Sequence, residues 1–252
     1  MSEKEKILIL DTEVNGKFVY DIGFIIAEES EKGFYHAVEK HQFLVEQIYY
    51  NHRLFTTDYY AKKRKTYTKL MKGRNAISKK FGYITQIIAH TIKKHDIKKV
   101  YAYNSNYDKT RFAFTSNDFK VINPFDKIEW HDIMAISNHF IHLSEKYINF
   151  AIENEYINSS GFIETTAETT YQFVDSNIDF KEEHTSLADC EIEMEILNYC
   201  IAKGYNKEQV YKTKNIPSDK LQVLTVIHES TEHKFGYVKR KNSYLKNQIT
   251  LT

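Results

Sequence analysis

The chain has 252 residues, of which 42% are hydrophobic and 27% are charged, and it contains only 2 Pro and 8 Gly. This composition is typical of a globular protein and excludes collagen-like and intrinsically disordered classes. Its 35 Lys and Arg nearly balance its 34 Asp and Glu, so the net charge of +1 identifies no partner and the local distribution of charge has to be considered.

The N-terminal part of the chain predicts an antiparallel meander of three strands. A buried strand is expected over 6–14, where a continuous apolar run precedes two acids. Asn15 and Gly16 then form a strong signal for a two-residue hairpin turn. Apolar segments at 17–29 and 33–46 predict the second and third strands.

Alternating helices and strands follow the meander. The isoleucine spacing over 76–95 predicts an amphipathic helix, and the apolar segment 98–104 predicts a fourth strand followed by a helix. A short strand that leads into a helix is expected over 127–137, and the clearest helix of the chain over 186–204. This order is typical of an α/β fold with a mixed sheet flanked by helices.

We expect one domain over 1–204 and a polar, basic C-terminal extension over 205–252, with a candidate strand at 221–230. No apolar run approaches the roughly 20 residues needed to cross a bilayer, and the polar N-terminus does not resemble a signal peptide. Cys190 and Cys200 fall in one predicted helix about 15 Å apart, too far for a mutual disulfide. These features favour a cytoplasmic protein without membrane association.

Two carboxylates end the first predicted strand. Asp11 and Glu13 are two residues apart and therefore share one face of that strand. Like charges at the end of a buried strand repel each other and are costly to desolvate, so they require a compensating positive charge.

Two further acids begin predicted helices. Asp108 follows the strand at 98–104, and Asp189 lies in the first turn of the helix at 186–204, with His184 five residues before it. Carboxylate oxygens are the ligands that Mg²⁺ and Mn²⁺ prefer, and two such ions can stabilise both oxygens of a phosphodiester displacement. A histidine with an ordinary pKa near 6.5 is suited to deprotonate the attacking water at neutral pH.

Three motifs, in chain order, resemble those of the DEDDh superfamily of 3′→5′ exonucleases. They are LDTE with Asp11 and Glu13, YNSNYD with Asn104 and Asp108, and HTSLAD with His184 and Asp189. The spacing His-x4-Asp is that of the histidine subclass; the sister group has Tyr-x3-Asp, and Thr185 stands at that tyrosine position. Weaker agreement is found in DIGFI, WHDIMAI and TAETTYQF, so that the resemblance covers residues 6–203.

The resemblance implies an RNase H-like fold and hydrolysis of a nucleic acid from its 3′ end to nucleoside monophosphates. The implied ligands of two Mg²⁺ or Mn²⁺ ions are Asp11, Glu13, Asp108 and Asp189. His184 is the implied general base. Thr12, Val14 and Asn104, which lie within these motifs, are candidate substrate contacts.

The segment 50–75 is a basic, tyrosine-rich insertion. Within 59–74 there are seven Lys or Arg, three Tyr and no acid. Cationic side chains neutralise phosphates, and aromatic rings stack on single-stranded bases for about 1–3 kcal/mol each. A charge run is more often solvated surface; beside a nuclease site we favour contact with single-stranded 3′ ends. The candidate substrate contacts in the insertion are Lys62, Lys63, Arg64 and Tyr67.

Two alternatives remain open. One is a catalytically silent nucleic-acid-binding module of the same fold, although binding alone requires no metal ligands. The other is an exoribonuclease rather than a DNA exonuclease, which the sequence does not distinguish because the 2′-hydroxyl decides that preference.

Overall fold

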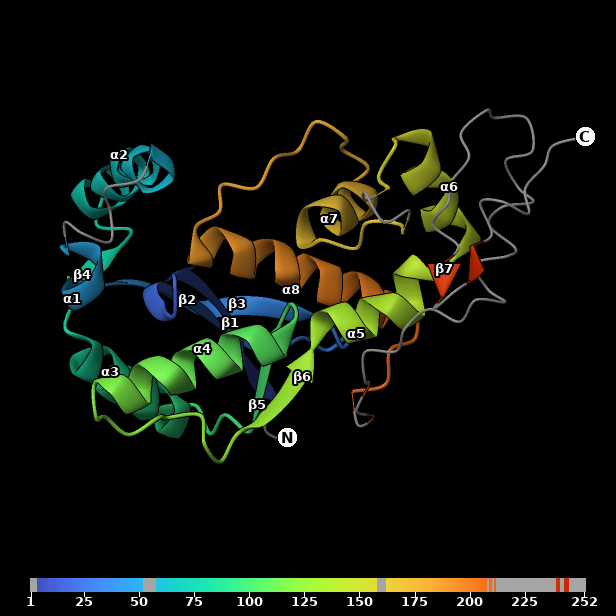
Figure 1. The fold of residues 1–252 in the computed structure, drawn as a ribbon. Helices are drawn as coiled ribbons and strands as arrows, with labels where there is room; N and C mark the ends of the chain where they lie inside the picture. The colour runs from blue at the N-terminus through green and yellow to red at the C-terminus, as the bar shows by residue number, and fades with distance from the viewer. Residues whose placement is uncertain are drawn as a thin grey trace, which may run out of the picture. The chain divides into compact units, whose positions relative to one another are not determined.

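The computed structural model describes residues 4–51, 58–157, 162–207, 209, 211, 239–240 and 243–244 (Figure 1). The chain divides into two compact units. The first comprises Met1–Ile133 and Glu182–Asn198, and the second comprises Met134–Lys181 and Tyr199–Thr252. All predicted metal ligands and His184 belong to the first unit, whereas the expected domain boundary at residue 204 stays a prediction.

A six-stranded mixed sheet with the order β4-β3-β2-β1-β5-β6 forms the centre of the first unit. The strands are β1 Lys6–Asn15, β2 Phe18–Glu29, β3 Tyr35–Val45, β4 Ile77–Lys79, β5 Lys99–Ala102 and β6 Glu129–Asp132. The pairs β1–β2 and β2–β3 are antiparallel, and the other three pairs are parallel. The predicted meander and α/β class are therefore confirmed, and the sheet is consistent with an RNase H-like fold.

Helices cover both faces of this sheet. They are α1 Glu46–Tyr49, α2 Asp58–Lys72, α3 Phe81–Lys94, α4 Ser105–Asp118 and the first part of α8 Ser186–Ala202. Helices α3 and α4 lie on one face, and α8 lies on the other (Figure 1). Because both faces are covered, the successive β1 residues Ile7, Leu8, Ile9 and Leu10 are all fully buried.

The predicted helix over 76–95 is wrong at its beginning. Residues Ile77–Lys79 form the edge strand β4, which pairs in parallel with β3, and α3 begins only at Phe81. Ile77, which was expected in the apolar stripe of the helix, is 49% exposed. Pairing with the available edge of β3 determines the conformation here, and local helical spacing cannot report such a long-range contact.

The second unit is helical over most of its described residues. It contains α5 Ile133–Ser137, a π-helical turn Asn138–His142, α6 Glu145–Glu153 and α7 Ala167–Asp175, and a short pair of strands, β7 Lys239–Arg240 and β8 Ser243–Tyr244. The buried His142 hydrogen-bonds Asn138 and Thr170 through its two ring nitrogens. Burial lowers the pKa of His142 to about 3, so its ring is neutral. The candidate strand at 221–230 lies outside the described residues.

The structure bears on two predictions about the helices: the state of the two cysteines and the search for a membrane-spanning segment. Cys190 and Cys200 both lie on α8, where each is buried and free of a disulfide, as predicted. Within the described parts of the chain, no helix combines the length and the apolar character required to cross a membrane.

Candidate metal and nuclease site

The end of β1 carries Asp11 and Glu13, and Thr12 between them holds the side chain of Asp108 by hydrogen bonds. Asp11 and Glu13 project from one face of the strand, and a register shift between Glu13 and Val14 marks a bulge. Thr12 projects from the opposite face, where its amide nitrogen and its hydroxyl donate hydrogen bonds of 3.0 and 2.7 Å to Oδ1 of Asp108. Asp108 is therefore held directly at the end of β1.

The turn before α4 brings Asp108 to this end of the sheet. Asn104 adopts a left-handed conformation (φ 58°) as the N-cap of α4. Its backbone nitrogen donates a hydrogen bond to Oδ1 of Asp132 at the end of β6. Asp108 follows in the first turn of α4 and is buried. Burial raises the pKa of Asp108 to about 7, although the two hydrogen bonds from Thr12 oppose that rise.

Helix α8 carries the next acids onto the other face of the sheet because it packs directly on a glycine. A Cβ atom at Gly23 of β2 would stand 2.3 Å from the amide nitrogen of Leu187 and 2.3 Å from the carbonyl carbon of Ser186. The Sγ atom of Cys190 lies 3.3 Å from the carbonyl oxygen of Gly23. This close approach places Asp189 above the strand face that presents Asp11.

The four predicted acids lie near enough to influence one another's protonation. Burial, and after it the charges of neighbouring carboxylates, raise the pKa of Asp11 well above its ordinary value. These neighbours are Asp108, Glu193, Asp189 and Glu13. Burial, and after it the charges of Glu182 and Glu13, raise the pKa of Asp189 to about 8. The acids therefore repel one another, as the sequence predicts for a site without enough positive charge.

Glu193 is a fifth acid in this site and was not predicted from the sequence. It follows Asp189 by four residues on α8, so the two side chains share one helix face. Glu193 is only 2% exposed, and burial and the charges of Asp108 and Asp189 raise its pKa well above the ordinary value. Oε2 of Glu193 and Oδ1 of Asp189 are buried and have no hydrogen-bond partner among the described residues. The spacing of these two acids was the signal that could have identified Glu193.

Lys63 supplies a positive charge within the site. Its Nζ atom donates to Oε1 of Glu13 at 2.8 Å, to the carbonyl oxygen of His184 at 2.9 Å and to the Tyr20 hydroxyl at 3.3 Å. Its side chain is 11% exposed. Lys63 was expected to contact substrate from the insertion; in the structure it forms an ion pair with Glu13 and donates a hydrogen bond to the backbone at His184.

Tyr67, one helical turn after Lys63, is wrong as a base-stacking residue because its ring is fully buried. Its hydroxyl donates to Oδ2 of Asp21 at 2.8 Å, and the amide nitrogen of Ser186 donates to the same oxygen at 3.1 Å. Burial raises the pKa of Asp21 to about 6 against these hydrogen bonds. Lys63 and Tyr67 thus connect α2 to the two ends of the segment from His184 to Ser186.

His184 lies at the solvent side of the acids. Its backbone is left-handed (φ 51°), its side chain is 55% exposed, and its Nδ1 atom is 3.3 Å from Oε2 of Glu182. One ligand atom each from Glu13, His184 and Asp189 lie within 4.8 Å of one another. Among the described residues, Asp11 and Asp108 are not part of that close group. The site therefore contains a compact set of three possible ligands within a wider group of acids.

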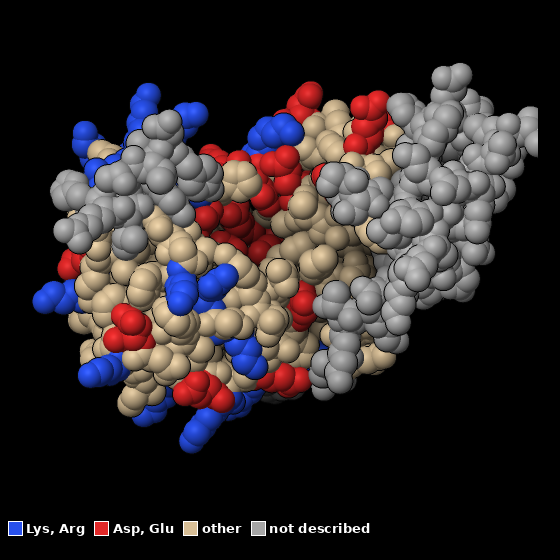
Figure 2. Space-filling view, viewed as in Figure 1, with Lys and Arg blue, Asp and Glu red and all other residues tan. Residues whose placement is uncertain are grey.

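The remaining predicted substrate contacts occupy different environments. Thr12 is buried and its hydroxyl donates a hydrogen bond to Asp108, so in this structure Thr12 positions one of the acids of the site. Val14 and Arg64 are half-buried, and Asn104 and Lys62 are exposed. Substrate contact by these four residues stays a prediction. On the face shown in Figure 2, Asp and Glu side chains gather together, and Lys and Arg side chains lie over α2.

Comparison of the chain with protein-family models and with curated proteins finds no match in either. The chemistry of the site therefore has to follow from its own residues.

The raised pKa values predict how stability depends on pH in the presence of EDTA. An acid whose pKa is raised by folding binds its proton more tightly in the folded state, so the free energy of unfolding falls as pH rises towards the folded-state pKa. With Asp108 at about 7 and Asp189 at about 8, we expect that free energy to decrease between pH 6.5 and pH 8 in urea denaturation. Below pH 6.5 the neutral His142 acts in the opposite direction.

Mg²⁺ is expected to remove most of this decrease, because a bound cation compensates the carboxylates that ionise. Asp189→Asn is the control variant and should show a shallower decrease in EDTA. A wild-type free energy of unfolding that rises with pH across this window in EDTA would contradict the prediction.

Proposed function

We propose that this chain is a metal-dependent 3′→5′ exonuclease that hydrolyses nucleic-acid phosphodiester bonds and releases nucleoside monophosphates. The observation that supports the proposal best is the convergence of acids from separate elements beside one exposed histidine. The residues concerned are Asp11, Glu13, Asp108, Asp189 and His184. These acids repel one another and so raise one another's pKa. Packing alone therefore gives no reason for placing them together.

The donor atoms of the site fit hard divalent cations. All the buried candidate ligands are carboxylate oxygens, and the unpartnered oxygens of Asp189 and Glu193 remain available within the site. Asp11, Glu13, Asp108 and Asp189 would hold Mg²⁺ or Mn²⁺, with two ions as the expected number. When bound, such ions supply charge stabilisation to the attacking and leaving oxygens of a phosphodiester displacement.

His184 is proposed as the general base. Its exposed ring can reach a water molecule beside a bound strand, and Glu182 lies on the Nδ1 side of the ring. If Nδ1 carries the proton and donates it towards Glu182, Nε2 is left as the acceptor. Nε2 would take the proton from water as the water oxygen bonds to phosphorus and the bond from phosphorus to the 3′-oxygen of the preceding nucleotide breaks.

The test is an assay on oligonucleotides labelled at the 5′ end, with Mg²⁺, Mn²⁺ or EDTA. The proposal expects a ladder of products that shortens by one nucleotide at a time from the 3′ end, and no products in EDTA. Matched DNA and RNA substrates determine the preferred nucleic acid. Oligonucleotide binding without cleavage in either metal would contradict the proposal and favour a catalytically silent binding module.

His184→Ala is expected to lower kcat by about 10²–10⁴-fold, the usual contribution of a general base, and to leave Mn²⁺ affinity unchanged. Isothermal titration with Mn²⁺ and single-turnover kinetics measure the two quantities. His36→Ala, which removes an exposed histidine on β3, is the control and should change neither. A large loss of Mn²⁺ affinity in His184→Ala would instead make His184 a metal ligand, which its distance from Glu13 and Asp189 allows.

A further inference from the structure

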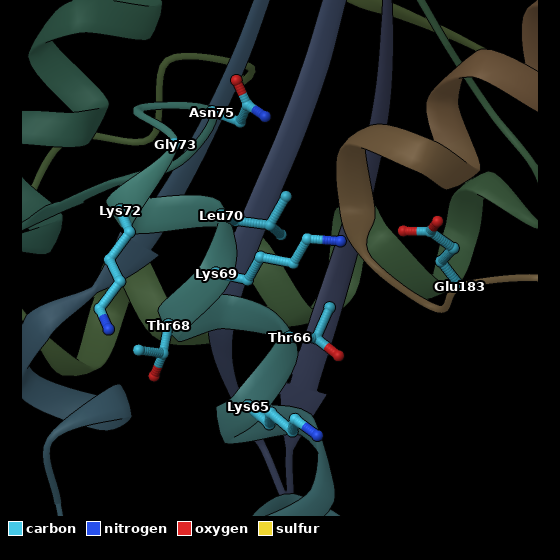
Figure 3. A pocket seen from close by; sticks show the side chains of 9 residues that line it. All are labelled: Lys65, Thr66, Thr68, Lys69, Leu70, Lys72, Gly73, Asn75 and Glu183. Atoms are coloured by element: carbon cyan, nitrogen blue, oxygen red, sulfur yellow. The ribbon is translucent and has the colours of Figure 1, made fainter.

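A pocket of about 1100 Å³ lies between α2, with the turn that follows it, and the loop that precedes α8 (Figure 3). Lys65, Thr66 and Lys69 line it from α2, Asn75 lines it from the turn, and Glu183 lines it from the loop. In Figure 3, Thr66 and Lys69 project towards the space in front of Glu183. The described residues that line this pocket do not include the proposed metal ligands.

The α2 wall of the pocket is cationic and open to solvent. Lys65 and Lys69 are four residues apart, so they lie on one face of α2, and both are exposed. Neither has an ion-pair partner within the described part of the chain, in contrast to Lys63, Lys94 and Lys99. The Thr66 hydroxyl and the Asn75 amide add hydrogen-bond donors to the same pocket. Ammonium groups and neutral donors together suit phosphate oxygens.

The pocket adjoins the proposed reaction site through two connections. Glu183 is the chain neighbour of His184, so the loop that forms one wall also carries the proposed base. The opposite wall is held to the same segment, because Lys63 donates to the carbonyl oxygen of His184 and Tyr67 shares Asp21 with Ser186. A strand whose 3′ end lies at the acids would therefore have its next nucleotides within reach of this pocket.

We propose that the pocket binds the phosphodiester backbone of the substrate strand on the 5′ side of the scissile phosphate. Lys65 and Lys69 contact backbone phosphates, and Thr66 and Asn75 donate hydrogen bonds to them. Glu183 carries the same charge as the strand and faces the lysines, so it weakens strand binding. This inference rests on the proposed exonuclease function, because that function defines where the 3′ end lies.

The test measures binding in an Asp11→Asn background, so that the strand is not cleaved. Fluorescence anisotropy follows a 12-nucleotide oligothymidylate, and separately an oligouridylate, over a range of salt concentrations. For single strands, the slope of log K against log salt changes by about 0.7 for each phosphate contact. Lys65→Gln with Lys69→Gln is expected to weaken binding and to reduce the magnitude of the slope by about 1.4, whereas Glu183→Gln is expected to tighten binding at low salt.

Lys98→Gln is the control, because it removes an exposed lysine next to the start of β5, the end of that strand away from Asp108. It should change neither affinity nor slope. With the active chain, the double lysine variant should raise KM for the 12-mer and leave the cleavage of a dinucleotide unchanged, because a dinucleotide does not extend into the pocket. Circular dichroism melting verifies that the variants are folded.

Two results separate this inference from the proposed function. The pocket proposal is overturned, and the exonuclease stands, if the wild-type chain cleaves but the double lysine variant keeps the salt slope of its Asp11→Asn parent. The same conclusion follows if Lys98→Gln lowers that slope by an equal amount. If the wild-type chain does not cleave while the double variant loses slope, the exonuclease fails and the pocket is supported as a nucleic-acid site. Tighter binding by the double lysine variant would also overturn the pocket proposal.

Discussion

Asp11→Asn is expected to lower kcat for hydrolysis at the 3′ end by about three orders of magnitude and to raise the melting temperature in EDTA. The loss is expected because Asp11 is a proposed metal ligand, and the charges of Asp108, Glu193, Asp189 and Glu13 all contribute to its raised pKa. Removing metal stabilisation worth about 4 kcal/mol corresponds to about a thousandfold in rate. The gain in stability follows because asparagine removes one of several buried, mutually repelling charges.

These opposite changes in stability and activity distinguish a functional acid from a structural one. Asp118→Asn, which changes an exposed acid at the end of α4, is the control and should alter neither quantity measurably. Melting curves in EDTA and in Mg²⁺, together with single-turnover kinetics, give the result. An Asp11→Asn variant that is less stable in EDTA and fully active in Mg²⁺ would remove Asp11 from the metal site.

The acids of the site could be found from the sequence because each is tied to a local pattern. The alternation of side chains along a strand places Asp11 and Glu13 on one face, and the structure has them there. Asp108 and Asp189 lie in the first turns of two helices that the sequence predicted. Glu193 has an equally local signal, because it follows Asp189 by four residues on α8, but it was not predicted.

The inward position of Lys63 could not be predicted in the same way. A run of lysines in a polar segment is usually solvated, and nothing local distinguishes Lys63 from Lys62 or Lys65. Its partners, Glu13 and the backbone of His184, are 50 and 121 residues away in the chain. The same reason explains the burial of Tyr67, which depends on Asp21 at a separation of 46 residues. Long-range contacts determine which side chains of a basic helix turn inward.

These contacts change the physical account of the first strand. The charges of Asp11 and Glu13 were expected to require divalent cations, and the structure adds Lys63 as a cation supplied by the chain itself. One ammonium group cannot compensate five carboxylates, since the pKa values of Asp11 and Glu193 remain well above the ordinary range and Asp189 titrates at about 8. The unbalanced charge that remains is the physical reason to expect affinity for divalent cations.

Gly23→Ala is expected to lower the free energy of unfolding by about 1–3 kcal/mol and to reduce kcat by about 10²-fold. The added Cβ would stand 2.3 Å from backbone atoms of both Ser186 and Leu187, and backbone cannot rotate away as a side chain can. Relief of this contact requires α8 to move away from β2. That movement displaces Asp189 and the adjoining His184 segment relative to Asp11, and a shift of about 1 Å is enough for such a loss of rate.

Gly82→Ala is the matched control for this substitution. Its Cβ would stand 3.3 Å from Cγ1 of Val121, a side-chain atom that can adjust, and its place in α3 favours alanine by about 1 kcal/mol. We therefore expect unchanged activity and equal or higher stability for Gly82→Ala, measured by urea denaturation and by the same kinetic assay. If Gly23→Ala were as stable and as active as Gly82→Ala, the packing of α8 on β2 would not be what positions Asp189, and the site would have to tolerate a displaced helix.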